Sequence, residues 1–163
     1  VRDNGRGIPV EMHKKGVAAE RIVLSTLHAG GKFDNNAYKT SGGLHGVGSS
    51  VVNALSAHLE VNVYKNGQIH HDAYERGIPT VELIDGLLQW LERQERLEQR
   101  FNFLAGSEIF EKTRFKADWL KSRLHETAYL NPKLTILYEN KRAGEAEKVT
   151  YSEPDGIVRM CAS

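Results

Sequence analysis

Hydrophobic positions along the chain change from helical to alternating spacing and back. Apolar residues at three- and four-residue intervals predict amphipathic helices over 17–27 and 115–130. In the second of these, Trp119, Leu120, Leu124 and Ala128 are expected to share the buried face. A further helix is expected over 49–55, with Ser49 or Ser50 as its N-terminal cap.

Alternating apolar residues predict strands in the remaining parts of the chain. They occupy 59–64 and 68–74, separated by Lys65-Asn66-Gly67, a sequence typical of a hairpin turn. A third strand is expected over 80–84, and two more around 134–138 and 149–151. This order of elements predicts an α/β two-layer sandwich with a mixed, largely antiparallel sheet.

One stretch of the chain, Gln89–Arg100 (QWLERQERLEQR), differs from its surroundings. It is dense in charge, lacks glycine and consists of good helix formers. By itself it predicts a solvated helix.

Composition limits the kinds of protein to which the chain can belong. Its 163 residues carry 22 Lys and Arg against 21 Asp and Glu, a net charge of +1, which argues against a basic nucleic-acid arm or an acidic tail. No apolar run is long enough to span a bilayer, and the single Cys161 excludes a disulfide scaffold. We therefore expect a soluble cytoplasmic protein without a membrane partner. Because the sequence begins at Val1, inside a glycine-rich loop, we expect it to be a piece of a longer protein.

The first glycine-rich stretch, Asp3–Pro9 (DNGRGIP), contains a carboxylate next to two closely spaced glycines. Such glycines allow a ligand to approach the backbone or the chain to adopt positive φ. Asp3, at the end of an expected strand, can accept a hydrogen bond from an exocyclic amine. An ordinary Asp-Gly turn remains the alternative.

The second stretch, 28–48, is more specific. It contains six glycines and runs directly into an expected helix, whose first N–H groups and dipole favour anions. Lys32 and Lys39 add positive charge, and His45 adds a donor. A flexible linker would lack the apolar residues found here. The spacing matches neither a Walker A loop nor a dinucleotide fingerprint, so we expect a phosphate site of another class.

These motifs resemble the ATPase domain of the B subunits of bacterial type IIA DNA topoisomerases, the DNA gyrase and topoisomerase IV group. The resemblance is carried by D-N-G-R-G-I-P, L-H-A-G-G-K-F and Y-K-T-S-G-G-L-H-G-V-G, and covers Val1–Ile84 and Ser107–Tyr151. It implies the two-layer fold shared with Hsp90, MutL and histidine kinases, with helices on one face of a mostly antiparallel sheet and with its N-terminal part missing.

The resemblance also implies an ATP-binding role for particular residues. Asp3 would bind the adenine amino group, with Arg6, Gly7 and Pro9 along the base and Val23 as an apolar wall. The remaining contacts would come from the glycine-rich stretch: Gly30, Gly31 and Lys32 in a closed lid, Tyr38 at the adenine, and Leu44, His45, Gly46, Val47 and Gly48 at the phosphates.

The family's catalytic groups are not assigned to residues of this chain. The resemblance implies that a general-base Glu and an Asn that holds Mg²⁺ lie upstream of the Asp3 loop. We expect Glu11 and Glu20 to be surface charges and His28 a loop or packing residue. Residues 1–151 would form a partial ATP-binding domain, and 152–163 would lead toward a transducer domain.

The parent protein would be an ATP-dependent topoisomerase that passes one DNA duplex through another. Its partners would be DNA, the A subunit and a second B subunit, joined through an ATP-closed gate. The choice between gyrase and topoisomerase IV stays open. So do a catalytically inactive nucleotide-binding fragment, a chaperone or repair ATPase of the same superfamily, and a purely structural α/β domain.

One segment departs from the family. At 89–103 the family has a strand with a Gly-Thr pair, whose Thr contacts an adenine-bound water, whereas this chain has neither residue there. We hypothesise a compensated reading-frame slip, since a shifted frame can encode Gly-Thr; a true insertion is the alternative. If the protein carries this segment, we expect disrupted sheet pairing and weakened nucleotide binding.

Overall fold

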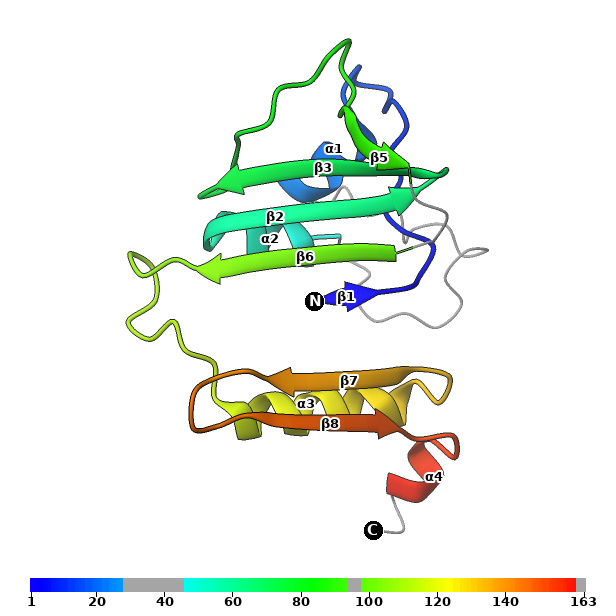
Figure 1. Ribbon diagram of the computed structural model, residues 1–163, viewed down its shortest axis with the longest axis vertical. Helices are drawn as coiled ribbons and strands as arrows, with labels where there is room; N and C mark the ends of the chain where they lie inside the picture. The colour runs from blue at the N-terminus through cyan, green and yellow to red at the C-terminus, as the bar shows by residue number, and fades with distance from the viewer. Residues whose placement is uncertain (28–45, 94–97, 161–163) are drawn as a thin grey trace. The chain divides into compact units, whose positions relative to one another are not determined.

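The strands between Arg2 and Ala105 form one antiparallel sheet (Figure 1). The computed structural model describes residues 1–27, 46–93 and 98–160. The chain divides into two compact units, Val1–Thr113 and Arg114–Ser163. The division expected after residue 151 stays a prediction.

The sheet of the first unit has the order β1-β6-β2-β3-β4, with β5 also paired to β3. Every strand pairing in the described part of the chain is antiparallel. The strands are β1 (Arg2–Asp3), β2 (Ser56–Lys65), β3 (Gln68–Glu75), β4 (Ile78–Pro79), β5 (Trp90–Arg93) and β6 (Glu98–Ala105).

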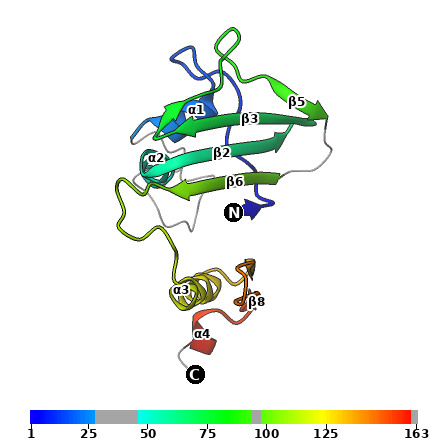
Figure 2. The same cartoon turned by 60° about the vertical axis from the view of Figure 1, so that its left-hand side comes forward.

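Two short helices, α1 (Ala19–Ser25) and α2 (Gly48–Ala54), cover one face of this sheet (Figures 1 and 2). The alternation predicted for 59–64 places Leu59, Val61 and Val63 on that face, where Val61 and Val63 are fully buried. They pack with Leu24 of α1 and with Tyr74 of β3. The predicted α/β sandwich with helices on one face is confirmed.

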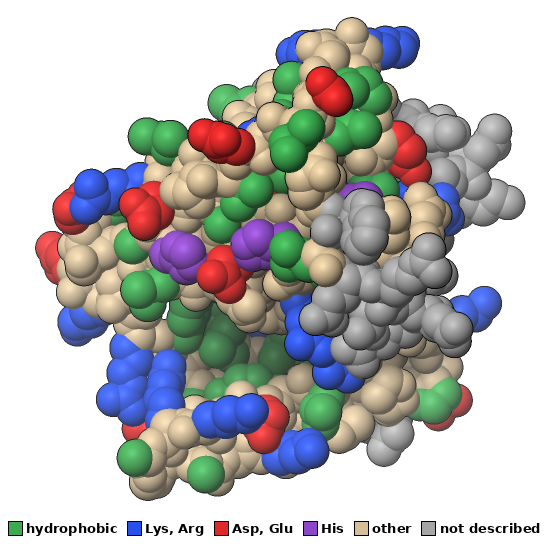
Figure 3. Space-filling model, turned by 45° about the horizontal axis from the view of Figure 1, so that its top comes forward, with side chains coloured by type: hydrophobic (Ala, Val, Ile, Leu, Met, Phe, Trp, Pro, Cys, Tyr) green, Lys and Arg blue, Asp and Glu red, His purple; other side chains and the backbone are tan. Residues whose placement is uncertain are grey.

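The opposite face of the sheet carries several polar side chains. His58 lies 3.2 Å from Glu60, and the His71 ring lies 2.9 Å from the Asn62 side chain. Figure 3 shows histidine and acidic side chains gathered on the surface. Tyr64, Ile69 and Ala73 on the same face are buried, so this face is only partly solvated.

The predicted hairpin between β2 and β3 is confirmed. Asn66 and Gly67 have φ values of 54° and 73°, the two positive values that a type I′ turn requires. Asn tolerates this region better than most residues, and Gly adopts it without strain.

The second unit contains α3 (Ala117–Leu130), the hairpin β7 (Thr135–Asn140) and β8 (Glu147–Ser152), and α4 (Ile157–Met160). The predicted helix over 115–130 and the two predicted strands after it are confirmed. Ala128 is fully buried, but Trp119 is 57% exposed, so the predicted buried face of α3 is only partly right. Among the described residues, no helix is long and apolar enough to cross a membrane.

The solvated helix predicted for Gln89–Arg100 is wrong. Residues 90–93 and 98–100 of this segment lie in strands, and β6 pairs with β2 from Ser56 to Tyr64 and with β1 at Asp3. The expected disruption of sheet pairing is therefore wrong as well, because cross-strand pairing outweighs the helical propensity of these residues. The origin of the segment in the gene stays a prediction.

Two smaller expectations are also wrong. Residues 80–84 form no strand, only an isolated bridge from Ile84 to Leu87. Glu20 is not a surface charge, because it is a fully buried residue of α1. Glu11 is exposed, as expected, and lies 3.6 Å from Lys65.

Candidate functional site

The carboxylate of Asp3 is held from two sides at the end of β1. The backbone N–H of Gly5 donates to Oδ1 over 2.9 Å. The side-chain amide of Gln99 in β6 donates from Nε2 to Oδ2 over 2.7 Å. The orientation of Asp3 is therefore fixed by its own loop and by the neighbouring strand.

The register of the sheet places this carboxylate on the face covered by the helices. Asp3 is opposite Gln99, Gln99 is opposite Val63, and Val63 is opposite His70. Residues directly opposite each other in antiparallel strands point to the same face. Since Val63 belongs to the core beneath α1, the Asp3 side chain lies on the same side of the sheet.

The loop after Asp3 contains two closely packed glycines. Gly7 has a φ of 79°, and a Cβ there would lie 3.3 Å from Cγ1 of Val63. A Cβ on Gly5 would lie 2.9 Å from Oδ1 of Asp3. Further along the loop, the N–H of Ile8 donates to Oε1 of Gln99 over 3.2 Å. The close packing of this loop accounts for both glycines.

Helix α2 begins where the second glycine-rich stretch ends. Gly46 has a φ of 61°, Val47 is the N-cap and Gly48 is the first helical residue. The predicted serine cap is wrong, since no side chain caps this helix. Ser49 instead donates to the carbonyl of Val23 over 3.4 Å, and Ser50 donates to that of Val47 over 3.1 Å.

The structure places only some of the expected nucleotide contacts. Asp3 and Gly7 belong to one loop packed on β2 and β6, while Arg6 and Pro9 are exposed in that loop and Val23 is half-buried on α1. The remaining expected contacts, Gly30, Gly31, Lys32, Tyr38, Leu44 and His45, lie outside the described residues, as does His28. The nucleotide-binding role of the whole set stays a prediction.

Gln99 is the residue beside Asp3 that sequence reasoning missed. A solvated helix over 89–100 leaves no reason to expect Gln99 beside Asp3. The useful signal was the position of the segment, because it occupies the place of a family strand. A strand there puts one of its side chains opposite Asp3.

A buried charge network joins α1 to β3 beside the core. Arg21 donates to both carboxylate oxygens of Asp72 and to the carbonyl of Val81. The Tyr74 hydroxyl donates to Asp72 over 2.5 Å, and burial raises the pKa of Tyr74. Glu20 lies nearby, and neither of its carboxylate oxygens has a hydrogen-bond partner among the described residues. Burial and the charge of Asp72 raise the pKa of Glu20 well above its ordinary value.

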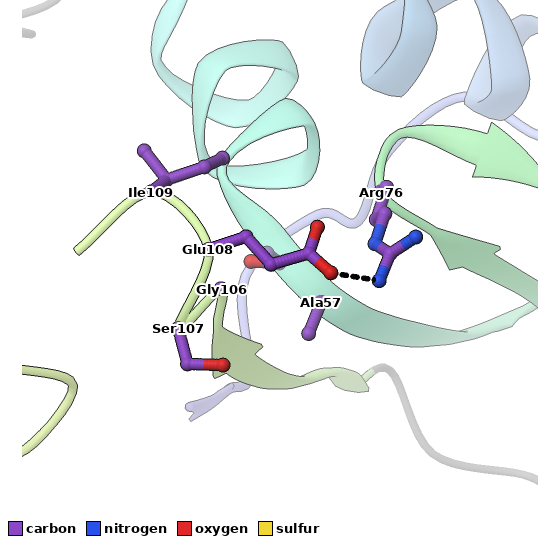
Figure 4. Close-up of a pocket in the computed structure, with 7 residues that line it drawn as sticks. Ala57, Arg76, Gly106, Ser107, Glu108 and Ile109 are labelled. Atoms are coloured by element: carbon purple, nitrogen blue, oxygen red, sulfur yellow. Dashed lines mark hydrogen bonds and ion pairs between the residues drawn. The ribbon is translucent and has the colours of Figure 1, made fainter. Parts of the chain in front are cut away.

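A pocket of about 90 Å³ lies at the end of β2 and β6 that is farther from Asp3 (Figure 4). The Arg76 guanidinium donates to Glu108 across it over 2.6 Å. Its lining residues are Ser56, Ala57, Arg76, Gly106, Ser107, Glu108 and Ile109. None of the expected nucleotide contacts is among them, so this pocket is separate from the Asp3 loop.

The described residues do not form a magnesium site. No group of three or more His, Cys, Asp or Glu in that part of the chain is placed to hold a metal ion. No chemical step is therefore assigned to Mg²⁺ on these residues.

The family model and the similar proteins that match this chain all include DNA gyrase B. The family model for histidine kinase-, DNA gyrase B- and HSP90-like ATPases matches residues 1–100. The DNA gyrase B subunit of Archaeoglobus fulgidus is 46% identical over 163 residues, 100% of this chain and 25% of the relative. The DNA gyrase B subunit of Thermotoga maritima is 46% identical over 161 residues, 97% of this chain and 24% of the relative. That of Borreliella burgdorferi is 45% identical over 160 residues, with 96% and 24% covered. The chain spans about a quarter of the length of these relatives.

Proposed function

The chain belongs to the family of histidine kinase-, DNA gyrase B- and HSP90-like ATPases, and on that premise we propose that it binds ATP as part of the B subunit of a type II DNA topoisomerase. The predicted resemblance to that group is confirmed by the gyrase B relatives. Their names favour a topoisomerase parent over a chaperone, a repair ATPase or a purely structural domain.

The observation that carries the proposal is the fixed carboxylate of Asp3. Its two oxygens are held by Gly5 and Gln99, so the carboxylate is oriented before a ligand arrives. An ionised carboxylate only accepts hydrogen bonds. Adenine offers an exocyclic amine as donor, whereas guanine offers a carbonyl at that position. Asp3 would therefore favour adenine.

The polyphosphate would bind where the second glycine-rich stretch meets α2. Val47 and Gly48 stand at the start of this helix, directly after the positive φ of Gly46. Their N–H groups, with those of Leu44 and His45, would donate to phosphate oxygens, and Lys32 would add positive charge. Gly30, Gly31 and Tyr38 would complete the enclosure of the nucleotide.

Activities of the whole protein are part of the same proposal. ATP binding would close a gate between two B subunits, and hydrolysis would reset it while one DNA duplex passes through another held with the A subunit. No residue of this chain is assigned as general base or Mg²⁺ ligand, so for the chain itself we propose nucleotide binding. The cytoplasmic location and the choice between gyrase and topoisomerase IV stay predictions.

Isothermal titration with a non-hydrolysable ATP analogue tests the proposal. We expect the 163-residue chain to bind it, and Asp3→Asn to weaken binding roughly ten- to a hundred-fold, the usual effect of losing a hydrogen bond to a charged group. Glu11→Gln is the matched control, because it neutralises an exposed carboxylate close in sequence. A wild-type chain that binds no analogue, or an Asp3→Asn chain that binds as well as wild type, contradicts the proposal.

A further inference from the structure

We propose that Gln99 is a second base-specificity residue, whose amide pairs with Asp3 to present a neighbouring donor and acceptor to the edge of a 6-aminopurine. This inference rests on the proposed function and adds a residue and a selection rule to it. It follows from contacts that converge on one half-buried side chain.

The hydrogen bonds of Gln99 fix which end of its amide faces Asp3. A backbone N–H can only donate, so the Ile8 N–H must meet the amide oxygen, Oε1, at 3.2 Å. The amide nitrogen, Nε2, therefore faces Oδ2 of Asp3 at 2.7 Å. The reverse orientation would place a donor against Ile8 and an acceptor against a carboxylate.

The backbone of Gln99 is held as firmly as its side chain. β6 lies between β1 and β2, and Gln99 pairs with Asp3 on one side and with Val63 on the other. Its side chain shares the helix-covered face with the core residue Val63. Strands β1 and β2 therefore hold the backbone of Gln99, and Asp3 and Ile8 hold its amide. Little rotational freedom of this side chain is left to lose when a ligand binds.

The two side chains still have hydrogen-bonding capacity toward a ligand. One hydrogen of Nε2 is used by Asp3, and the other has no partner among the described residues. Oδ2 of Asp3 retains a second lone pair. An acceptor and a donor thus lie side by side, 2.7 Å apart.

This pair complements adenine and opposes guanine. Adenine carries an amine donor next to a ring-nitrogen acceptor, whereas guanine carries a carbonyl acceptor next to a ring N–H donor. With guanine, the carboxylate would face an acceptor and the amide a donor, leaving the polar groups of both partners unpaired. Sites that hydrogen-bond a ligand group strongly reject analogues that cannot form the bond.

Gln99→Leu is the sharpest test because it removes the donor beside Asp3 and the acceptor for Ile8 without adding a charge. A second carboxyl group at this position would lie 2.7 Å from Asp3, share a proton with it and so keep a donor there. Asn102→Leu is the matched control, since Asn102 lies on the same strand but is exposed on the opposite face. Binding of non-hydrolysable ATP and GTP analogues to each 163-residue variant is measured by titration, and folding is checked by thermal unfolding.

We expect Gln99→Leu to weaken binding of the ATP analogue at least about ten-fold and to reduce the ATP-over-GTP preference by a similar factor, with Asn102→Leu unchanged. If Gln99→Leu weakens both analogues equally, or changes neither, Gln99 has no specificity role and the inference is overturned. A wild-type chain that binds both analogues equally overturns it as well, while ATP binding itself stands. A wild-type chain that binds neither overturns the proposed function too.

Discussion

Arg21 of α1 and Asp72 of β3 form a two-point ion pair, with Nε and Nη2 donating to the carboxylate over 3.1 and 2.6 Å. The Asp72 side chain is fully buried and that of Arg21 is 13% exposed. Because α1 carries Leu24 into the core beneath the sheet, this pair fixes the helix against β3 on the face that also bears Asp3.

We predict that Arg21→Met lowers the free energy of unfolding by about 3–5 kcal/mol, because it leaves Asp72 charged, buried and without its cation. Arg76→Met is the control. It breaks the ion pair between Arg76 and Glu108, whose side chains are 66% and 67% exposed. Exposed pairs of this kind contribute at most about 1 kcal/mol to the free energy of unfolding. Urea unfolding monitored by circular dichroism measures both, and equal losses would contradict the prediction.

Glu20→Gln should stabilise the protein at neutral and higher pH. The folded-state pKa of Glu20 is raised by burial and by Asp72, so the folded chain keeps a proton that the unfolded chain releases near pH ~4.3, as ordinary glutamate does. The contribution of Glu20 to stability is therefore complete below that pH and is lost as pH rises toward the folded-state pKa. Each unit of pKa difference is worth about 1.4 kcal/mol.

Thermal unfolding of wild type and Glu20→Gln at about pH 4 and about pH 8, on either side of the ordinary carboxyl range, measures this difference. The variant should match wild type at the acidic pH and unfold at a higher temperature at the alkaline pH. The exposed Glu82→Gln should show no such dependence. A Glu20→Gln variant that is less stable than wild type at the alkaline pH would show that the buried carboxylate is needed in its charged form.

Gly7→Ala should weaken nucleotide binding more than Gly16→Ala does. Both glycines have positive φ, 79° and 73°, so both variants carry similar backbone strain of about 1 kcal/mol. Only at Gly7 would the new methyl group meet the sheet, 3.3 Å from Val63, whereas nothing lies within 4 Å at Gly16. The methyl should displace the loop that holds Asp3.

Titration of each glycine variant with the ATP analogue checks this prediction. We expect roughly a ten-fold loss of affinity for Gly7→Ala and no more than about a two-fold change for Gly16→Ala. Equal affinities would mean that the packing of the loop on Val63 does not position the Asp3 carboxylate.

Local signals predicted much of the fold. The alternation at Leu59, Val61 and Val63 correctly identified the buried face of β2, because a one-residue shift would expose all three. The Asn66-Gly67 turn was predictable since few sequences tolerate two successive positive φ values. By contrast, the strand expected over 80–84 does not form. Asp85 and Gly86, with φ values of 51° and 78°, make a turn directly after these residues.

The candidate site was predictable only in part. Asp3 and the glycines of its loop were identified from their chemistry and from the resemblance. Gln99 was not, because its contact with Asp3 joins residues far apart in sequence and depends on β6 lying between β1 and β2. Glu20 was misjudged because a charged residue is rarely fully buried, and no local pattern marks an exception.

If the proposed function is correct, one nucleotide contacts both the Asp3 loop and the start of α2. Amide chemical shifts of the ¹⁵N-labelled chain, recorded during titration with the ATP analogue, can detect both contacts in one experiment. We expect the amides of Asp3, Gly5 and Ile8 to shift together with those of Val47 and Gly48, with one shared affinity. Shifts confined to the pocket at Gly106–Ile109, or shifts at only one of the two segments, would show that no single nucleotide bridges them.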